Sequence, residues 1–160
     1  MTKPVTTTEQ LTGELSGKIP TAWAASFCAV DRAMFIPPRI WTYNDRDEPQ
    51  PLDRDADPQR WRQVVYSDTA IMTQFDNGTT AWPDTTGVLP TSSASQPSLV
   101  MDMLTSLDVR NGHRVLEIGT GTGYTAALLT ARLGDGRSRS ERKTERVPGG
   151  INPGRLAAIS

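Results

Sequence analysis

The chain has 160 residues, enough for one domain of ordinary size, and its 17 basic and 18 acidic side chains nearly cancel. This balance gives no overall field that favours a nucleic-acid or membrane partner, and no apolar run approaches the ~20 residues that a membrane-spanning helix needs. The single cysteine excludes an internal disulfide and, with a polar N-terminus that lacks a signal-peptide core, predicts a cytoplasmic protein.

Residues 1–90 are expected to form an N-terminal α+β subdomain that begins with helical segments. A short helix is predicted around Leu11 and Leu15, in an otherwise loosely ordered lead-in. A second helix is predicted from Thr21, because apolar residues recur there at intervals of four and three: Trp23, Phe27 and Val30. Cys28 lies in this apolar pattern and is therefore predicted to be a small buried residue.

The rest of this subdomain is predicted to contain a surface loop and a hairpin. Residues 45–62 are dense in charge and proline, which favours an extended surface loop. Without a histidine or a regular ligand spacing, the acids there do not predict a metal site. Residues 70–75 alternate like a strand, and Asp76-Asn77-Gly78 is a hairpin signal, so the returning strand is predicted at 79–82.

A second unit is predicted over residues 91–136. Ser95-Gln96-Pro97 marks the start of a helix, with the serine or the glutamine near the cap and the proline in the first turn. The apolar residues expected to share one face of this helix are Leu99, Val100, Met103, Leu104 and Leu107. Asn111-Gly112 then predicts a turn into the next strand.

The segment after that turn has the pattern of a buried strand, a glycine loop and a helix: residues 115–118, then Gly119, Gly121 and Gly123, then residues 124–133. Open α/β sheets use this unit to hold an anionic or nucleoside ligand over a helix N-terminus. A dinucleotide fingerprint requires G-x-G-x-x-G, whereas here the pattern is E-x-G-x-G-x-G, with Glu117 two residues before the first glycine. A carboxylate at that point suits a cationic or hydroxyl-bearing ligand better than a pyrophosphate.

At these residues the sequence resembles the S-adenosylmethionine-dependent methyltransferases, whose first motif has this form. The segment Thr91 to Pro97 narrows the resemblance to the protein-L-isoaspartate O-methyltransferase family, which carries a T-x-S-Q-P segment just there. Ser93 stands where that family usually has threonine. Residues 27–37 are similar to the family's first helix and F-x-P turn, and residues 71–78 look like the branch found with ATP-grasp peptide maturation systems. The resemblance ends near residue 136.

The resemblance implies the N-terminal part of a Rossmann-like α/β methyltransferase fold, with S-adenosylmethionine as cofactor and no metal. The implied cofactor-binding residues are Glu117, Gly119, Thr120, Gly121, Gly123 and Tyr124, and the implied catalytic residues are Ser95 with Ser93 as a helper. The implied reaction is O-methylation of isoaspartyl or aspartyl carboxylates in a protein or precursor peptide. Such a carboxylate is ionised at pH 7, so no strong general base is needed.

Simpler interpretations stay open for several of these residues. Ser95 alone would be read as a plain helix cap, and Glu117 as a strand-end acid that binds backbone amides. Tyr124 either covers a ligand or packs in the core. His113, the only histidine, is predicted to lie at a surface turn and not to act as a general base.

Residues 137–160 depart from the pattern that a doubly wound fold requires. Residues 137–146 contain no apolar side chain, so no buried strand is predicted there, although Glu141 lies near where a ribose-binding acid would fall. Residues 137–160 together hold six basic and two acidic residues and are predicted to be a disordered or out-of-frame tail. The chain would then be a C-terminally truncated methyltransferase, weak or inactive alone.

Two further readings belong to other functional classes. The chain could be a non-catalytic remnant that folds poorly or only binds a partner. Six cations in the tail could also give unspecific, salt-sensitive contact with nucleic acid, but a disordered tail accounts for the same composition, so nucleic acid is not expected as a partner.

Overall fold

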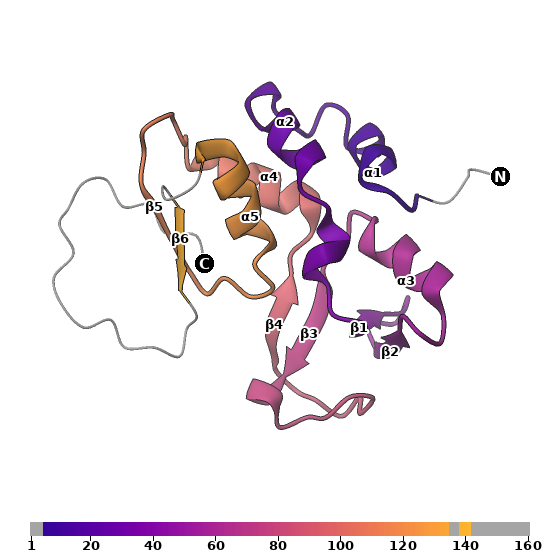
Figure 1. The fold of residues 1–160 in the computed structure, drawn as a ribbon. Coiled ribbons are helices and arrows are strands. Elements are labelled where there is room, and N and C mark those ends of the chain that lie inside the picture. The colour runs from indigo at the N-terminus through magenta and orange to yellow at the C-terminus, as the bar shows by residue number, and fades with distance from the viewer. Residues whose placement is uncertain (1–4, 135–137, 142–160) are drawn as a thin grey trace, which may run out of the picture.

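The computed structural model describes residues 5–134 and the backbone of residues 138–141. The described part contains a four-stranded antiparallel sheet of order β2-β1-β3-β4, a parallel pair β5-β6, and helices packed around both (Figure 1). The helices are α1 Thr8–Glu14, α2 Thr21–Ala29, α3 Pro58–Val65, α4 Pro97–Ser106 and α5 Tyr124–Leu133, with 3-10 turns η1 Arg32–Phe35 and η2 Asp76–Gly78. The strands are β1 Arg39–Tyr43, β2 Pro49–Asp53, β3 Ile71–Phe75, β4 Pro90–Ala94, β5 Val115–Ile118 and β6 Ser138–Glu141.

The first two helices form where the apolar pattern predicted them. The predicted stripe of α2 is buried: Trp23, Phe27 and Val30. Leu11 and Leu15, on and just after α1, are buried as well. The prediction for Cys28 is wrong, because this thiol is exposed. Successive side chains in an α-helix point about 100° apart around the axis, so Cys28, the residue after Phe27, lies off the buried stripe.

The prediction of one extended loop over residues 45–62 is also wrong. This region contains β2, which pairs antiparallel with β1 in the register Arg39↔Asp53 to Tyr43↔Pro49, and most of α3. The prolines of β2 are tolerated because the strand lies at the edge of the sheet, where a missing N–H breaks no ladder. Helix α3 begins at a regular cap, since the Asp57 carboxylate accepts from Arg60 N at 2.9 Å.

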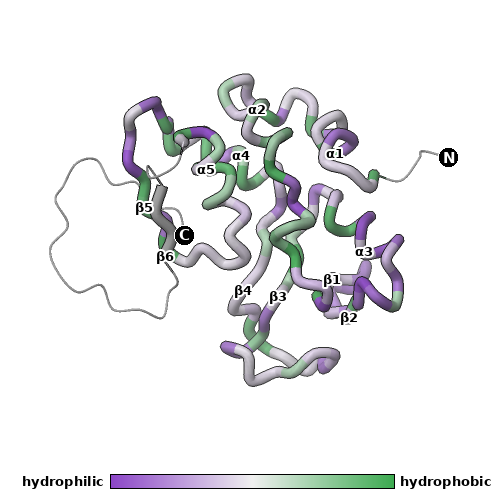
Figure 2. The backbone as a smooth tube through the Cα atoms, viewed as in Figure 1, coloured by the Kyte–Doolittle hydropathy of each residue, from purple (hydrophilic) through white to green (hydrophobic). Residues whose placement is uncertain are grey.

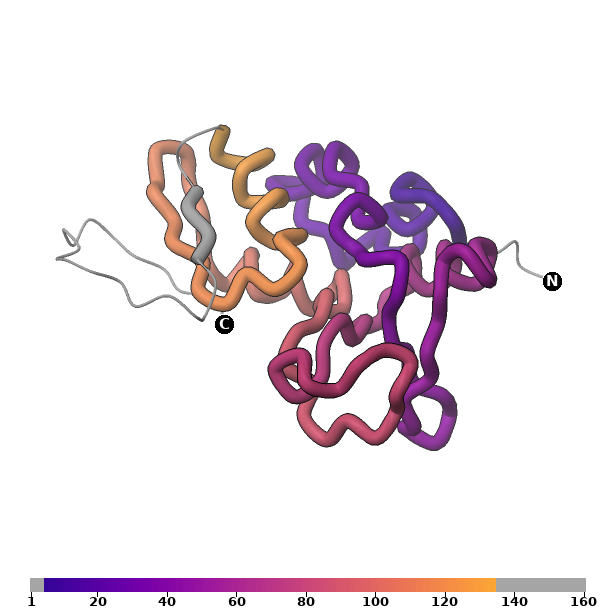
Figure 3. Tube along the Cα trace, turned by 60° about the horizontal axis from the view of Figure 1, so that its bottom comes forward, coloured from indigo at the N-terminus to yellow at the C-terminus, as the bar shows by residue number. Residues whose placement is uncertain are grey.

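The predicted strand at 70–75 is confirmed as β3, but the returning strand is not at 79–82. Thr80 makes only an isolated bridge with Phe75, and the partner of β3 is β4. A longer loop therefore connects the two strands and projects from the sheet, as the magenta segment in Figure 3 shows. The Asp76 carboxylate closes this loop, because it accepts from the backbone N–H groups of Val88 and Leu89 and from the Thr80 hydroxyl.

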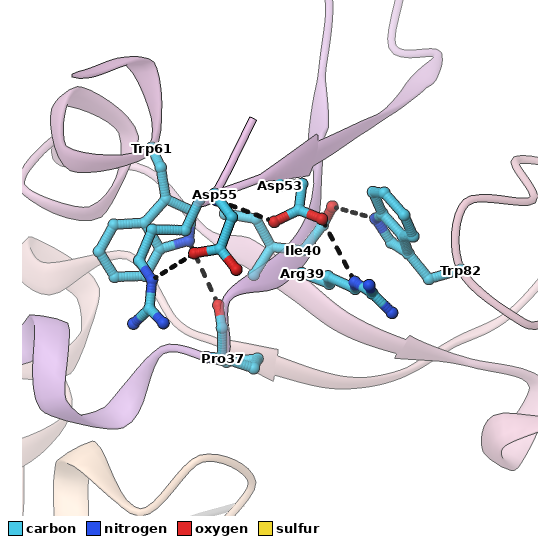
Figure 4. Close-up of polar contacts among 8 residues, drawn as sticks. Pro37, Arg39, Ile40, Asp53, Asp55, Trp61 and Trp82 are labelled. Atoms are coloured by element: carbon cyan, nitrogen blue, oxygen red, sulfur yellow. Dashed lines mark hydrogen bonds and ion pairs between the residues drawn. The ribbon is translucent and has the colours of Figure 1, made fainter. Parts of the chain in front are cut away.

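Indole N–H groups tie this loop to β1 and helix α3 to the segment just before β1. Trp82 Nε1 donates to Ile40 O at 3.2 Å, and Trp61 Nε1 donates to Pro37 O at 3.2 Å (Figure 4). The Arg39 guanidinium lies 5.1 Å from the centre of the Trp82 ring and pairs with Asp53 at 3.3 Å. These contacts tie the projecting loop and α3 to the antiparallel sheet and involve no residue of the glycine loop.

The helix at Ser95-Gln96-Pro97 forms as predicted, but its buried face differs. Proline is the first helical residue and Gln96 is the cap residue, without a side-chain cap bond. The buried residues are Pro97, Val100, Met101 and Leu104, whereas Leu99 is 50% exposed. The strand β5, the glycine loop and α5 follow as predicted, and Gly134 ends α5 with a φ of 81°.

A short strand lies in the segment where no buried strand was predicted. Residues 138–141 form β6, which pairs in parallel with β5 in the register Val115↔Ser138 to Ile118↔Glu141. Backbone pairing does not require apolar side chains, so a polar sequence can extend the sheet. Glu141 thus lies at the carboxyl end of β6, next to the end of β5. The predictions for residues 142–160 fall outside the described residues.

One apolar core joins the helices and both sheets. It contains side chains from before and after residue 90, among them Phe27, Ile71, Leu104 and Leu128. Figure 2 shows the apolar stretches gathered where α2, α4 and α5 meet. The proposed boundary between residues 90 and 91 falls inside β4. Within the described ranges, no helix is long and apolar enough to cross a membrane.

Candidate functional site

A cavity of about 160 Å³ lies between the end of β4, helix α4 and the glycine loop. Of the eight residues predicted for the site, seven line this cavity: Ser93, Ser95, Glu117, Gly119, Thr120, Gly121 and Tyr124. Gly123 is not among the lining residues. Two segments more than 20 residues apart in the sequence, the serine segment and the glycine loop, therefore meet at one cavity.

The glycine loop has a backbone that other residues would strain. The φ angles are +78° at Gly119, +55° at Gly121 and +90° at Gly123, the left-handed region that favours glycine. A Cβ atom on Gly121 would lie 3.0 Å from the backbone oxygen of Ser93, whereas one on Gly119 would meet nothing within 4 Å. Gly121 thus allows the loop to touch β4, and Gly119 leaves open space beside it.

Glu117 supplies a buried carboxyl group at the end of β5. It is 5% exposed, and Thr120 Oγ1 donates to its Oε2 at 2.7 Å. Burial raises the pKa of this carboxyl above its ordinary value, and the Thr120 hydrogen bond acts in the opposite direction. No cation among the described residues pairs with Glu117. The cavity wall therefore carries an acid that a cationic ligand would stabilise in its charged form.

Two serine hydroxyls also border the cavity, from β4 and the segment that follows it. Neither Ser93 nor Ser95 makes a side-chain hydrogen bond to any described residue, although both line the cavity. Ser95 is also not the cap of α4, because Gln96 occupies that position. Two hydroxyl groups are thus available to a ligand, and the interpretation of Ser95 as a plain helix cap is excluded by geometry.

Tyr124 both packs and borders the cavity. It is 3% exposed, and its ring centre lies 6.0 Å from that of Phe35 at an angle of 56°. Burial raises the pKa of its phenol to about 12, so the group stays neutral over the physiological range. As the first residue of α5, it also fixes the start of the helix that follows the glycine loop.

The sequence predictions missed the apolar wall of the site. Leu99 and Met103 line the cavity from α4, four residues and about one turn apart. The sequence predictions placed both residues on the buried face of the helix. Leu99 is instead 50% exposed, and both side chains border the cavity. Thr122 and Thr125 add hydroxyl-bearing side chains at the start of α5.

The described ranges contain no group of three or more His, Cys, Asp or Glu side chains that could hold a metal ion. His113 lies just after the turn at 111–112, where its Nδ1 accepts from Arg110 N at 3.3 Å. The predicted surface turn is therefore its position in the fold.

Comparison with known protein families gives a match over more than half of the chain. Residues 50–138 match the family model described as Protein-L-isoaspartate(D-aspartate) O-methyltransferase (PCMT). Protein-L-isoaspartate O-methyltransferase 2 of Rhodopseudomonas palustris is 46% identical over 67 residues, which cover 40% of this chain and 30% of that protein. Protein-L-isoaspartate O-methyltransferase 1 of Archaeoglobus fulgidus is 40% identical over 77 residues, 48% of this chain and 29% of that protein.

Solved structures agree in fold over part of their chains. One protein-L-isoaspartate O-methyltransferase superimposes with a TM-score of 0.52 at 24% identity, over 84% of this chain and 33% of its own. A Plasmodium falciparum protein of the same description, solved with S-adenosyl-L-homocysteine, gives a TM-score of 0.52 at 16% identity, over 85% of this chain and 48% of its own. The chain thus spans about a third to a half of these structures and less than a third of the curated relatives.

Proposed function

Because the chain belongs to the protein-L-isoaspartate(D-aspartate) O-methyltransferase family, we propose that it binds S-adenosylmethionine at the cavity between β4 and the glycine loop. There it transfers a methyl group to the carboxylate of an isoaspartyl or aspartyl side chain in a protein or peptide. The observation that carries this proposal is that one cavity is lined by a buried acid without a cationic partner and by two unpartnered hydroxyls.

The residues of the cavity fit this cofactor. Glu117 has one neutral donor and no cationic partner among the described residues, so it suits a ligand that carries an ammonium group or a hydroxyl. The open space beside Gly119 lets a ligand approach the backbone at the start of α5. Leu99 and Met103 offer apolar surface to a methyl or methylene group. When bound, S-adenosylmethionine supplies an electrophilic methyl group on a sulfonium.

The chain's own residues then have to position the acceptor. An isoaspartyl carboxylate is ionised at neutral pH, so the protein needs to align its oxygen and exclude water more than it needs to remove a proton. The Ser95 hydroxyl donates to one carboxylate oxygen, and Ser93 assists from the strand before it. Hydroxyl donors at fixed positions keep the nucleophilic oxygen in line, and they carry no charge of their own.

The size of the cavity limits what the described residues hold. At about 160 Å³ it is smaller than the roughly 300–1,000 Å³ typical of small-molecule sites. The part of a nucleoside ligand that Glu117 and the glycine loop contact fits there. The ribose would then lie toward the end of β6, where Glu141 pairs with Ile118 in the parallel register.

Calorimetry with S-adenosyl-L-homocysteine, the demethylated product, tests the cofactor site. Micromolar binding with one-to-one stoichiometry supports the proposal. No heat from a chain that unfolds cooperatively overturns it, and no heat from a chain without a cooperative transition supports the alternative of a non-catalytic remnant. Methylation of an isoaspartyl peptide, compared with the same peptide containing ordinary aspartate, then tests the reaction.

The similarity of residues 71–78 to the peptide-maturation branch favours a precursor peptide as substrate. In the structure these residues form β3 and the turn that begins the projecting loop, so they border β4 rather than the cavity itself. Comparable rates on aspartyl and isoaspartyl peptides would favour a precursor peptide. A strong preference for isoaspartate would contradict it and favour action on damaged proteins.

A further inference from the structure

Arg32 is a buried cation beneath the serine segment that no motif pointed to. It is 1% exposed, and its guanidinium donates to backbone oxygens from two segments, residues 65–69 and 94–95. The acceptors are Val65 O at 2.8 Å, Ser67 O at 3.1 Å, Thr69 O at 2.9 Å, Ala94 O at 3.4 Å and Ser95 O at 2.9 Å. One side chain from η1 thus joins the segment before β3 to the end of β4.

The charge of Arg32 has no ion-pair partner in the described part of the chain. Burial lowers its pKa to about 10, and nearby Tyr124 and Asp68 act in the opposite direction. The group therefore stays protonated at neutral pH. A buried guanidinium is costly unless its donors are satisfied, and here backbone carbonyls accept from its two terminal nitrogens in place of a carboxylate, whereas Nε has no partner among the described residues. An apolar side chain would fill this space at a lower desolvation cost. Stability alone therefore does not explain an arginine at this position.

Asp68 also binds the turn between β4 and α4, which carries Ser95. Its Oδ1 accepts from Ser98 N at 2.8 Å, in the first turn of α4, and its Oδ2 pairs with Lys18 at 3.2 Å. This carboxylate replaces the cap bond that Gln96 does not make. The turn that carries Ser95 is thus bound by a cation at its carbonyl oxygens and by an anion at a backbone N–H.

We infer that Arg32 is a positioning residue, whose hydrogen bonds to the backbone at Ala94 and Ser95 set the Ser95 hydroxyl against the acceptor carboxylate. The inference rests on the proposed function and deepens it, because it assigns a role to a residue that does not line the cavity. Arg32 acts through the backbone of the serine turn and not on the cofactor. Its removal should therefore lower kcat and leave cofactor affinity nearly unchanged.

Arg32→Lys and Arg32→Met separate positioning from general stability. Lysine keeps the charge but not the fork of donors, and methionine removes both. Arg54→Met is the matched control, because Arg54 is half-exposed over the Trp61 ring and does not line the cavity. Lysine keeps the turn partly held, so it also provides a folded variant if methionine prevents folding.

Three readouts apply to each variant. Amide exchange should accelerate at least 10-fold at residues 94–98 in Arg32→Lys, with exchange in α1 and α5 unchanged. The kcat for an isoaspartyl peptide should fall at least 10-fold, while affinity for S-adenosyl-L-homocysteine stays within 3-fold. In a Ser95→Ala background the lysine substitution should cost less than 2-fold, because a residue that acts through Ser95 has no further effect once its hydroxyl is gone.

The outcomes distinguish this inference from the proposed function. Uniform acceleration of exchange across the chain, or equal losses of kcat and cofactor affinity, would show that Arg32 only stabilises the fold. A full 10-fold cost of the lysine substitution in the Ser95→Ala background would also overturn the inference. A wild-type chain that neither binds S-adenosyl-L-homocysteine nor methylates peptide would instead overturn the proposed function, and the role of Arg32 with it.

Discussion

The protonation state of Glu117 decides whether the cavity attracts a cation. Its only hydrogen bond among the described residues comes from a neutral hydroxyl, so burial is not offset by an opposite charge. Glu117→Gln keeps the shape and removes the charge. Because a hydrogen bond to a charged group contributes roughly 1.5–3 kcal/mol, affinity for S-adenosylmethionine should fall roughly 10- to 100-fold by calorimetry. Glu14→Gln, at an exposed site on α1, should bind like the wild type.

The raised pKa of Glu117 also predicts how stability and binding depend on pH. The folded state binds this proton more tightly than the unfolded state, so the destabilising contribution of the charged group is lost as pH falls through the raised pKa. Cofactor affinity should fall over the same range, because the cation then meets a neutral acid. The glutamine variant should lack both effects and should melt no lower than the wild type at pH 7. A lower melting temperature would contradict this account.

Gly121 is the contact point between the two motifs, and alanine there should separate them. A non-glycine residue at positive φ costs roughly 1–2 kcal/mol, and the added Cβ lies 3.0 Å from Ser93 O. Gly121→Ala should therefore lower the unfolding free energy and weaken cofactor binding together. Gly13→Ala is the matched control: Gly13 lies in α1 with open space around it, so alanine should stabilise by roughly 0.5–1 kcal/mol. Chemical denaturation measures both.

At the scale of elements, the sequence predicted the helices and strands whose apolar residues recur periodically. Helices α2, α4 and α5 and strand β5 follow such patterns, and the family follows from the glycine motif and the Ser95-Gln96-Pro97 segment. Strand β4 is mostly serine and threonine and β6 is polar, so their backbone pairing leaves no apolar pattern. Helix α3 was hidden among charges, since its buried residues are only Trp61 and Val65.

The site was predictable to a similar extent. Its lining residues in the glycine loop stand in a recognisable spacing, and the cavity brings seven of the eight predicted residues together. The roles assigned to them stay predictions. Arg32 could not be found in this way, because its partners are backbone oxygens. Any residue type supplies such an oxygen, so tertiary contacts of this kind leave no trace in the sequence.

The loop between β3 and β4 depends on one carboxylate. Hydrogen bonds from the Thr80 side chain and the Leu89 and Val88 backbone lower the pKa of Asp76, so its contribution to the loop should persist until pH falls below the ordinary range of a carboxyl. Asp76→Ala should open the loop, and limited proteolysis should then cut between residues 79 and 89. Asp55→Ala, at an exposed site after β2, should leave the cleavage pattern unchanged. An uncut loop in Asp76→Ala would show that the tryptophan contacts suffice.

At the scale of the whole molecule, one core connects the parts on either side of residue 90. Helices α2 and α5 pack against each other, and Phe27 and Leu128 are both fully buried in the same cluster. The first turn of α5 borders the cavity, so the N-terminal helices support it although they do not line it. A chain built in this way should unfold as one cooperative unit rather than as two.

The tryptophans make this cooperativity measurable. All four, Trp23, Trp41, Trp61 and Trp82, precede residue 90, so their fluorescence reports only on the N-terminal part, whereas circular dichroism reports on every helix. Leu128→Ala removes buried side-chain volume from α5 and should cost about 2–5 kcal/mol. If the core is shared, the fluorescence and dichroism midpoints should fall by the same amount, although the substitution lies far from most of the indoles in the sequence.

Val88→Ala, at a side chain that is 88% exposed in the projecting loop, should move neither midpoint. If Leu128→Ala left the fluorescence transition in place while dichroism split into two steps, residues 1–90 would be an independently stable unit. The glycine loop would then lack the support that α2 gives to α5, and a ligand would have to order it on binding. Coincident transitions instead mean that α5 and the N-terminal helices unfold as one unit.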